Sequence, residues 1–80
     1  MARFLLHHQH APRECRAAFA AWTGHDSPLR RRVTVASCVF GGHAIWWTVE
    51  AADEGAALEL LPSYVADRTE AIRVRQVEIP

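Results

Sequence analysis

Residues 32–50 read RVTVASCVFGGHAIWWTVE and indicate a pair of strands. β-branched and aromatic residues dominate both halves of this stretch, and such residues favour extended backbone. The dipeptide Gly41-Gly42 separates the halves and is typical of a tight hairpin turn. We therefore expect antiparallel strands over 32–40 and 43–50.

The segments on either side of this hairpin each predict a strand and a helix. Residues 3–9 are compatible with a strand that places Phe4, Leu6 and His8 on one face, and Pro12 begins a segment with apolar residues at helical spacing. Asp53 is a suitable cap for a second helix, which Pro62 should end or kink, and residues 70–79 again have a strand pattern, with a bulge. The order β-α-β-β-α-β is that of an α+β, ferredoxin-like domain, a four-stranded antiparallel sheet with two helices on one face. Right-handed crossovers place the third strand between the first and the second.

The chain of 80 residues is long enough for one domain, residues 1–80. Folding of so small a chain hides only about 60 to 65% of its surface, so we expect support from a metal, a partner subunit or a disulfide. The formal net charge is zero, which argues against a nucleic-acid partner. We find no signal-peptide core, no membrane-spanning segment and no glycine-rich loop for a nucleotide cofactor. We therefore expect a cytoplasmic protein with reduced cysteines.

Both faces of the predicted sheet are largely apolar. In the predicted hairpin Phe40 lies opposite His43, which determines which residues of the two strands share a face. The helices cover one face, and we expect the other to be buried against a second copy in a homodimer. The residues expected at this interface are Val33, Val35, Val39 and Trp46.

Five residues that can bind a transition metal fall at one edge of the predicted sheet. The first and second strands end there, and the first helix and third strand begin there. Imidazole and thiolate groups suit Zn, Ni or Cu better than Mg or Ca. Each residue also has an ordinary structural interpretation, because cysteine is often a buried apolar residue and histidine a hydrogen-bonded one. The candidate ligands are His8, His10, Cys15, Cys38 and His43.

Three short segments of the chain resemble a known group of proteins. The opening MARFLL (1–6), the TVEA at the end of the third strand (48–51) and the final VEIP (77–80) are similar to small actinobacterial proteins of unknown function. These proteins belong to the ferredoxin-like, dimeric α+β barrel superfamily, near a group described as nickel-binding. The resemblance implies the ferredoxin-like fold and the homodimer. The superfamily also includes cofactor-free monooxygenases and muconolactone-type isomerases, so its chemistry is varied.

Three functions agree with these observations. The first, which we favour because it also supplies stability, is binding of a transition metal by the His/Cys cluster. The second is a cofactor-free enzyme, isomerase-like or monooxygenase-like, that acts on a small molecule with His8 or His10 as general base. Its apolar pocket wall would be Phe19, Trp47 and Tyr64. The third is a dimeric interaction module without a catalytic site.

Overall fold

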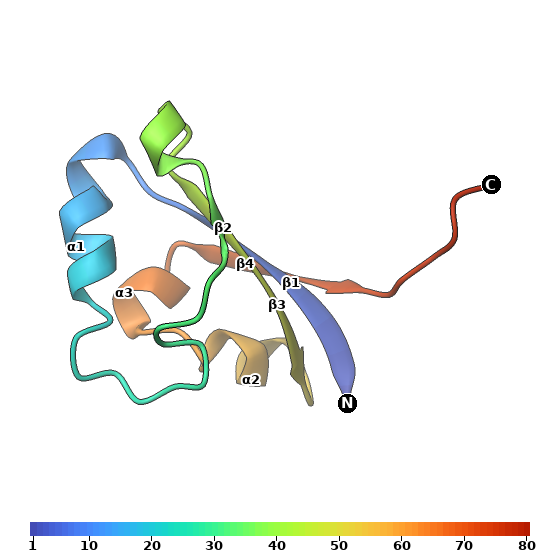
Figure 1. Cartoon of the computed structure of the whole chain (residues 1–80). Coiled ribbons are helices and arrows are strands. Elements are labelled where there is room, and N and C mark those ends of the chain that lie inside the picture. The colour runs from blue at the N-terminus through green and yellow to red at the C-terminus, as the bar shows by residue number, and fades with distance from the viewer.

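The computed structural model describes residues 1–80 and combines one β-sheet with short helices (Figure 1). The strands are β1 (Ala2–Gln9), β2 (Val35–Ala36), β3 (Ala44–Ala51) and β4 (Thr69–Val74). The α-helices are α1 (Cys15–Ala20), α2 (Glu54–Leu58) and α3 (Ser63–Ala66), and the 3-10 turns are η1 (Pro12–Glu14) and η2 (Cys38–Phe40). No helix has the length and hydrophobicity needed to cross a membrane.

The four strands form one antiparallel sheet in the order β2-β3-β1-β4. β3 therefore lies between β1 and β2, as the crossover rule predicts. The helices α1, α2 and α3 lie on the same side of the sheet (Figure 1). The predicted α+β class and four-stranded antiparallel sheet are thus confirmed, with three short helices in place of two.

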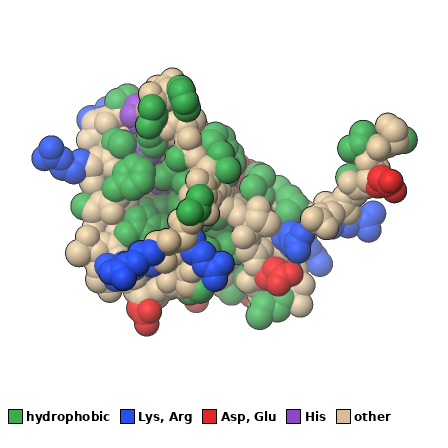
Figure 2. All heavy atoms as spheres, in the orientation of Figure 1, with side chains coloured by type: hydrophobic (Ala, Val, Ile, Leu, Met, Phe, Trp, Pro, Cys, Tyr) green, Lys and Arg blue, Asp and Glu red, His purple; other side chains and the backbone are tan.

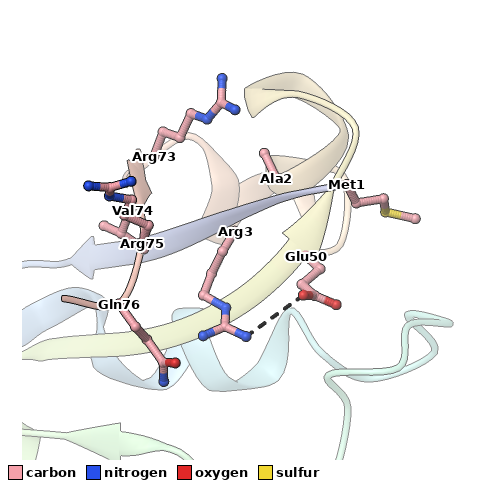
Figure 3. A pocket seen from close by; sticks show the side chains of 8 residues that line it. All are labelled: Met1, Ala2, Arg3, Glu50, Arg73, Val74, Arg75 and Gln76. Atoms are coloured by element: carbon pink, nitrogen blue, oxygen red, sulfur yellow. Dashed lines mark ion pairs between the residues drawn. The ribbon is translucent and has the colours of Figure 1, made fainter. Parts of the chain in front are cut away.

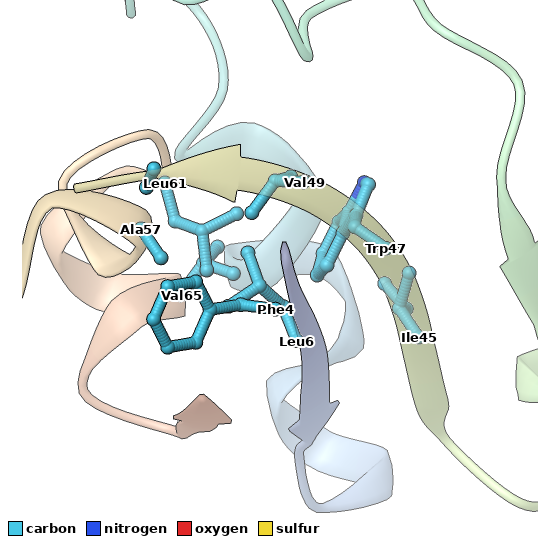
Figure 4. Close-up of a cluster of buried hydrophobic side chains, with 9 residues drawn as sticks. Phe4, Leu6, Ile45, Trp47, Val49, Ala57, Leu61 and Val65 are labelled. Atoms are coloured by element: carbon cyan, nitrogen blue, oxygen red, sulfur yellow. The ribbon is translucent and has the colours of Figure 1, made fainter. Parts of the chain in front are cut away.

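Alternate residues of the two central strands build the core beneath the helices. Phe4 and Leu6 of β1 are buried, and so are Ile45, Trp47 and Val49 of β3. Successive side chains of a strand point to opposite faces, so the residues between these lie on the other face of the sheet, away from this core. Side chains from α2, from α3 and from the segment between them close the layer, namely Ala57, Leu61 and Val65 (Figure 4).

The second helical region begins as predicted, but α2 ends at Leu58, before it reaches Pro62. Asp53 caps α2, because its Oδ1 accepts a hydrogen bond of 2.8 Å from the Ala56 N–H. Pro62 separates α2 from α3 and is the residue that directly precedes α3.

The predicted strand over 32–40 is wrong for most of its length. Val35 pairs with Trp46 and Ala36 with Ile45, whereas the predicted register would place Val35 opposite Thr48. The pair Phe40–His43 does not form, because the chain makes the turn η2 and then a left-handed residue, Gly41, with φ of 86°. The shift is by an even number of residues, so Val35 and Trp46 still share the face that the helices leave open.

Two other predictions need correction, one about this face and one about the last strand. Val33 and Val39 lie outside the strands, in exposed loop and turn segments, and not on the sheet. The predicted strand over 70–79 ends at Val74, where the ladder with β1 ends opposite Arg3, so no bulge forms. The remaining residues project away from the body as an extended C-terminal segment (Figure 1).

Candidate metal site

Four metal-binding side chains meet at one end of the sheet. His10 directly follows β1, Cys15 begins α1, Cys38 begins η2 and His43 directly precedes β3. One ring nitrogen from each histidine and the sulfur of each cysteine all lie within 4.8 Å of one another. The structure therefore brings together four of the predicted ligands at the predicted edge; His10 is buried and the other three are partly buried.

The loop between β2 and β3 fixes the positions of Cys38 and His43. The Ser37 N–H donates to the Ala44 carbonyl (2.8 Å), and Ser37 Oγ accepts from the Ala44 N–H (3.1 Å). His43 adopts the left-handed region with φ of 50°, which costs a non-glycine residue roughly 1–3 kcal/mol. The His10 N–H donates to the His43 carbonyl (3.1 Å) and so ties the end of β1 to this loop.

The turn η1 holds Cys15 at the start of α1. Glu14 Oε1 accepts a hydrogen bond of 2.8 Å from the Ala11 N–H. Its other oxygen, Oε2, accepts from Arg68 through Nε (3.1 Å) and Nη2 (3.0 Å). The Ala11 N–H and the Arg68 guanidinium both lower the pKa of the Glu14 carboxyl. This pair of contacts, which we call the Glu14–Arg68 clamp, fastens the start of α1 to the segment before β4.

His8 lies behind His10 and is not a member of the four-residue group. Its Nδ1 is 3.2 Å from the Val65 carbonyl oxygen and 3.2 Å from Thr69 Oγ1, and its Nε2 is 2.8 Å from His10 Nδ1. A carbonyl oxygen can only accept, so Nδ1 of His8 carries the proton and Nε2 of the neutral ring accepts. His10 Nδ1 must then donate, which leaves His10 Nε2 unprotonated, 3.7 Å from Cys38 Sγ.

Burial favours the uncharged forms of these groups. Loss of solvation lowers the pKa of both His8 and His10, and the neighbouring His43 lowers that of His10 further. Burial also raises the pKa of the Cys38 thiol, and the adjacent Cys15 adds to this effect. Neutral imidazole is the form that binds metals, whereas thiols lose their protons when they bind.

The enzyme hypothesis requires a cavity at His8 or His10, and the structure has none. His8 is 0% exposed, and neither histidine lines any of the surface hollows. Phe19 and Trp47, two of the residues predicted for a pocket wall, do line a hollow of about 330 Å³. The third, Tyr64, does not line it. The histidines and the hollow are therefore separate features.

Sequence reasoning missed the residues that support the site from the end of the chain. Val65 and Thr69 contact His8, and Arg68 contacts Glu14, across separations of 54 to 61 residues. No local pattern indicates contacts at this distance. The one available signal was strand register, because Thr69 lies directly opposite His8 in the β1–β4 ladder.

The largest hollow lies at the opposite end of the sheet (Figure 3). It has a volume of about 490 Å³ and is lined by Arg3, Glu50, Arg73 and Arg75 among others. Arg3 Nη2 and Glu50 Oε1 form an exposed ion pair at 3.8 Å. No histidine or cysteine lines this hollow, so it has no part in the metal site.

The four-residue group could hold a single metal ion. It supplies two imidazole nitrogens and two sulfurs, a His2Cys2 set of the kind found at tetrahedral zinc sites. Among known proteins, no family model, no curated protein and no solved structure matches the chain. The donor set and its geometry are therefore the basis for assigning a function.

Proposed function

We propose that this protein binds one zinc ion per chain through His10, Cys15, Cys38 and His43. The observation that carries the proposal is the convergence of the four donor atoms within 4.8 Å. The donors come from the end of β1, the start of α1, the turn η2 and the start of β3, so a metal bound to all four would join these elements.

One pair of donor atoms has the spacing of a tetrahedral zinc site, and all the donor atoms lie within 4.8 Å of one another. With Zn–S of about 2.3 Å and Zn–N of about 2.0 Å, donor atoms in a tetrahedron are about 3.3 to 3.8 Å apart. The distance of 3.7 Å between His10 Nε2 and Cys38 Sγ falls within this range. His43 Nδ1 is buried without a hydrogen-bond partner, and coordination by this nitrogen would satisfy it.

Zinc fits the donor set better than the other metals that imidazole and thiolate attract. A tetrahedral set of two nitrogens and two sulfurs favours zinc, whereas Ni(II) and Cu(II) with nitrogen and oxygen donors prefer planar or tetragonal arrangements. Four protein ligands leave no open coordination position for a substrate, so the ion would be structural. A structural ion would supply the support that a chain of 80 residues needs.

The test is metal content, with cobalt as a spectroscopic probe. Protein purified under reducing conditions without chelator should contain one zinc per chain, and Co(II) titrated into the metal-free protein should give the absorption of a tetrahedral thiolate complex. The variant C15S/C38S should lose both signals. The variant H25Q, in a histidine outside the group, should keep them. Retention of stoichiometric metal by C15S/C38S would overturn the proposal.

We also propose that the domain is ferredoxin-like and that two copies pair through the open face of the sheet. The strand order supports the first part. Exposed apolar residues support the second, because Val35 is 68% and Ile72 38% exposed on a face that no helix covers. Arg3 and Glu50 lie on the same face, so a copy related by a two-fold axis would offer opposite charges to each.

A further inference from the structure

We infer that the hollow lined by Phe19 and Trp47 binds a small organic anion, an apolar molecule that carries one carboxylate or phosphate group. The hollow has a volume of about 330 Å³, at the lower end of the range of about 300–1,000 Å³ for small-molecule sites. It lies on the helix side of the sheet, and none of the four proposed zinc ligands lines it. The inference is therefore independent of the metal.

The floor and one wall of this hollow are apolar and aromatic. Ile45 and Trp47 of β3 form the floor and are only 4% and 7% exposed. The Trp22 ring lies against Trp47, with ring centroids 5.8 Å apart. Phe19 is 52% exposed at the edge. A flat apolar ligand placed against these rings would cover the Phe19 ring and remove its apolar surface from water.

All the charged residues around the hollow are basic. Arg30, Arg31 and Arg32 line it, and no Asp or Glu does. The ion pairs of the chain involve Arg3 and Arg68, so these three guanidinium groups have no carboxylate partner. Guanidinium groups bind carboxylate and phosphate through paired hydrogen bonds. Figure 2 shows arginine side chains beside hydrophobic ones on this face of the molecule.

A strained turn presents the arginines at the edge of the hollow. The Arg30 N–H donates to the Ser27 carbonyl (3.1 Å) and the Arg32 N–H to the Leu29 carbonyl (3.2 Å). Between them Arg31 has φ of 66°, in the left-handed region that a non-glycine residue seldom adopts. Strained residues of this kind cluster at active sites, ligand clamps and switch regions. The turn therefore holds the three arginines together at the edge of the hollow.

Binding can be followed at the tryptophan indole N–H signals in NMR spectra of the labelled protein. Trp22 and Trp47 line the hollow, whereas Trp46 lies on the other face of the sheet and is an internal control. The probes are naphthoate and naphthyl phosphate, with naphthalenemethanol as the uncharged match and inorganic phosphate as the charge alone. We expect one or both naphthyl anions to shift the Trp22 and Trp47 signals saturably, and the tighter one identifies the head group.

Variants separate anion recognition from mere apolar contact. We expect R30Q/R32Q to bind the naphthyl anions about tenfold or more weakly, and the matched R73Q/R75Q, at the opposite end of the sheet, to bind them as wild type does. The Trp46 signal reports that each variant is folded. Four results would overturn the inference: equal binding by R30Q/R32Q, equal affinity for naphthalenemethanol, equal affinity for inorganic phosphate, or a Trp46 shift as large as that of Trp47.

Discussion

His8 controls the protonation of His10 without belonging to the four-residue group. Because His8 Nδ1 donates to the Val65 carbonyl, its Nε2 accepts from His10 Nδ1, and His10 Nε2 is left with a lone pair. In metal sites, partners that orient a ligand histidine in this way contribute about 10- to 100-fold to metal affinity. The sequence indicates His8 as a ligand, but in the folded chain it is placed to orient His10, one of the proposed ligands.

The variant H8F removes the acceptor and keeps a ring of similar size. We expect its zinc affinity to fall about tenfold or more, because His10 can then adopt the other tautomer, while the stoichiometry at saturation stays unchanged. Competition with a chromophoric chelator measures the affinity. H8Q, whose amide oxygen can accept a hydrogen bond, should recover part of the loss. H7F, on the opposite face of the same strand, is the control, and equal affinities for H8F and H7F would refute this role of His8.

At the scale of the elements, the β2–β3 loop depends on the absence of a side chain at Gly42. A Cβ on this residue would lie 2.3 Å from Ser37 Oγ and 2.8 Å from Ser37 Cβ. Ser37 cannot move without losing its bonds to Ala44. We expect G42A to open the loop that carries Cys38 and His43, and so to lower both the melting temperature and the zinc affinity.

The matched control for G42A is a second glycine-to-alanine change. Gly55 lies in α2, where an added Cβ meets only Asp53 Oδ1 at 3.4 Å. Alanine favours a helix over glycine by up to about 1 kcal/mol, so G55A should melt at the same or a higher temperature and bind zinc normally. Indistinguishable melting and zinc binding for G42A and G55A would show that the loop tolerates the side chain.

The Glu14–Arg68 clamp gives a second prediction for an element, the helix α1. We expect E14Q to lower the melting temperature clearly and to weaken zinc binding, because the start of α1 carries Cys15 and loses its charged attachment. R3Q is the control, since it breaks an exposed pair of 3.8 Å, and such surface pairs contribute little. Circular dichroism measures the melting temperature, and the difference between zinc-loaded and metal-free protein reports how strongly zinc binds. An R3Q protein that melts as low as E14Q would contradict the role of the clamp.

The parts of the fold that were predictable depend on local patterns and on topology. Phe4 and Leu6 mark the buried face of β1, and the order of elements alone brings Cys38 and His43 to one edge. Length and register were not predictable, because they depend on contacts between distant segments. Val39 has a strand-forming side chain, yet it lies in η2, where the hydrogen bonds of the loop outweigh its propensity.

The sequence also did not indicate which residue of the neighbouring strand each histidine lies opposite. His8 and His10 have the same parity and both face the helices, as alternation predicts. Only the β1–β4 register shows that His8 lies opposite Thr69, one step inside the sheet, where both of its nitrogens have partners. Which histidine joins the four-residue group is therefore determined by pairing with the last strand, and not by spacing along the first.

At the scale of the whole molecule, the two faces of the sheet differ in how they are covered. The helices cover one face, and the other carries a row of side chains across the strands, Val35, Trp46, His7 and Glu70. The rings of His7 and Trp46 stack in parallel, with centroids 5.4 Å apart and planes inclined by 2°. This stacked pair lies at the centre of the surface that we propose as the homodimer interface.

The substitution W46E places a charge at the centre of that surface. In a dimer with two-fold symmetry the change occurs twice and brings two carboxylates into a buried apolar contact, so we expect the dissociation constant to rise about a hundredfold or more. Light scattering across a dilution series measures the mass of wild type and variant. W46F, which keeps an aromatic ring, should remain dimeric. Zinc content should be the same in all three proteins, because Trp46 faces away from the four-residue group. A dimeric W46E protein would exclude this face as the interface, and a monomeric wild type would exclude the homodimer itself.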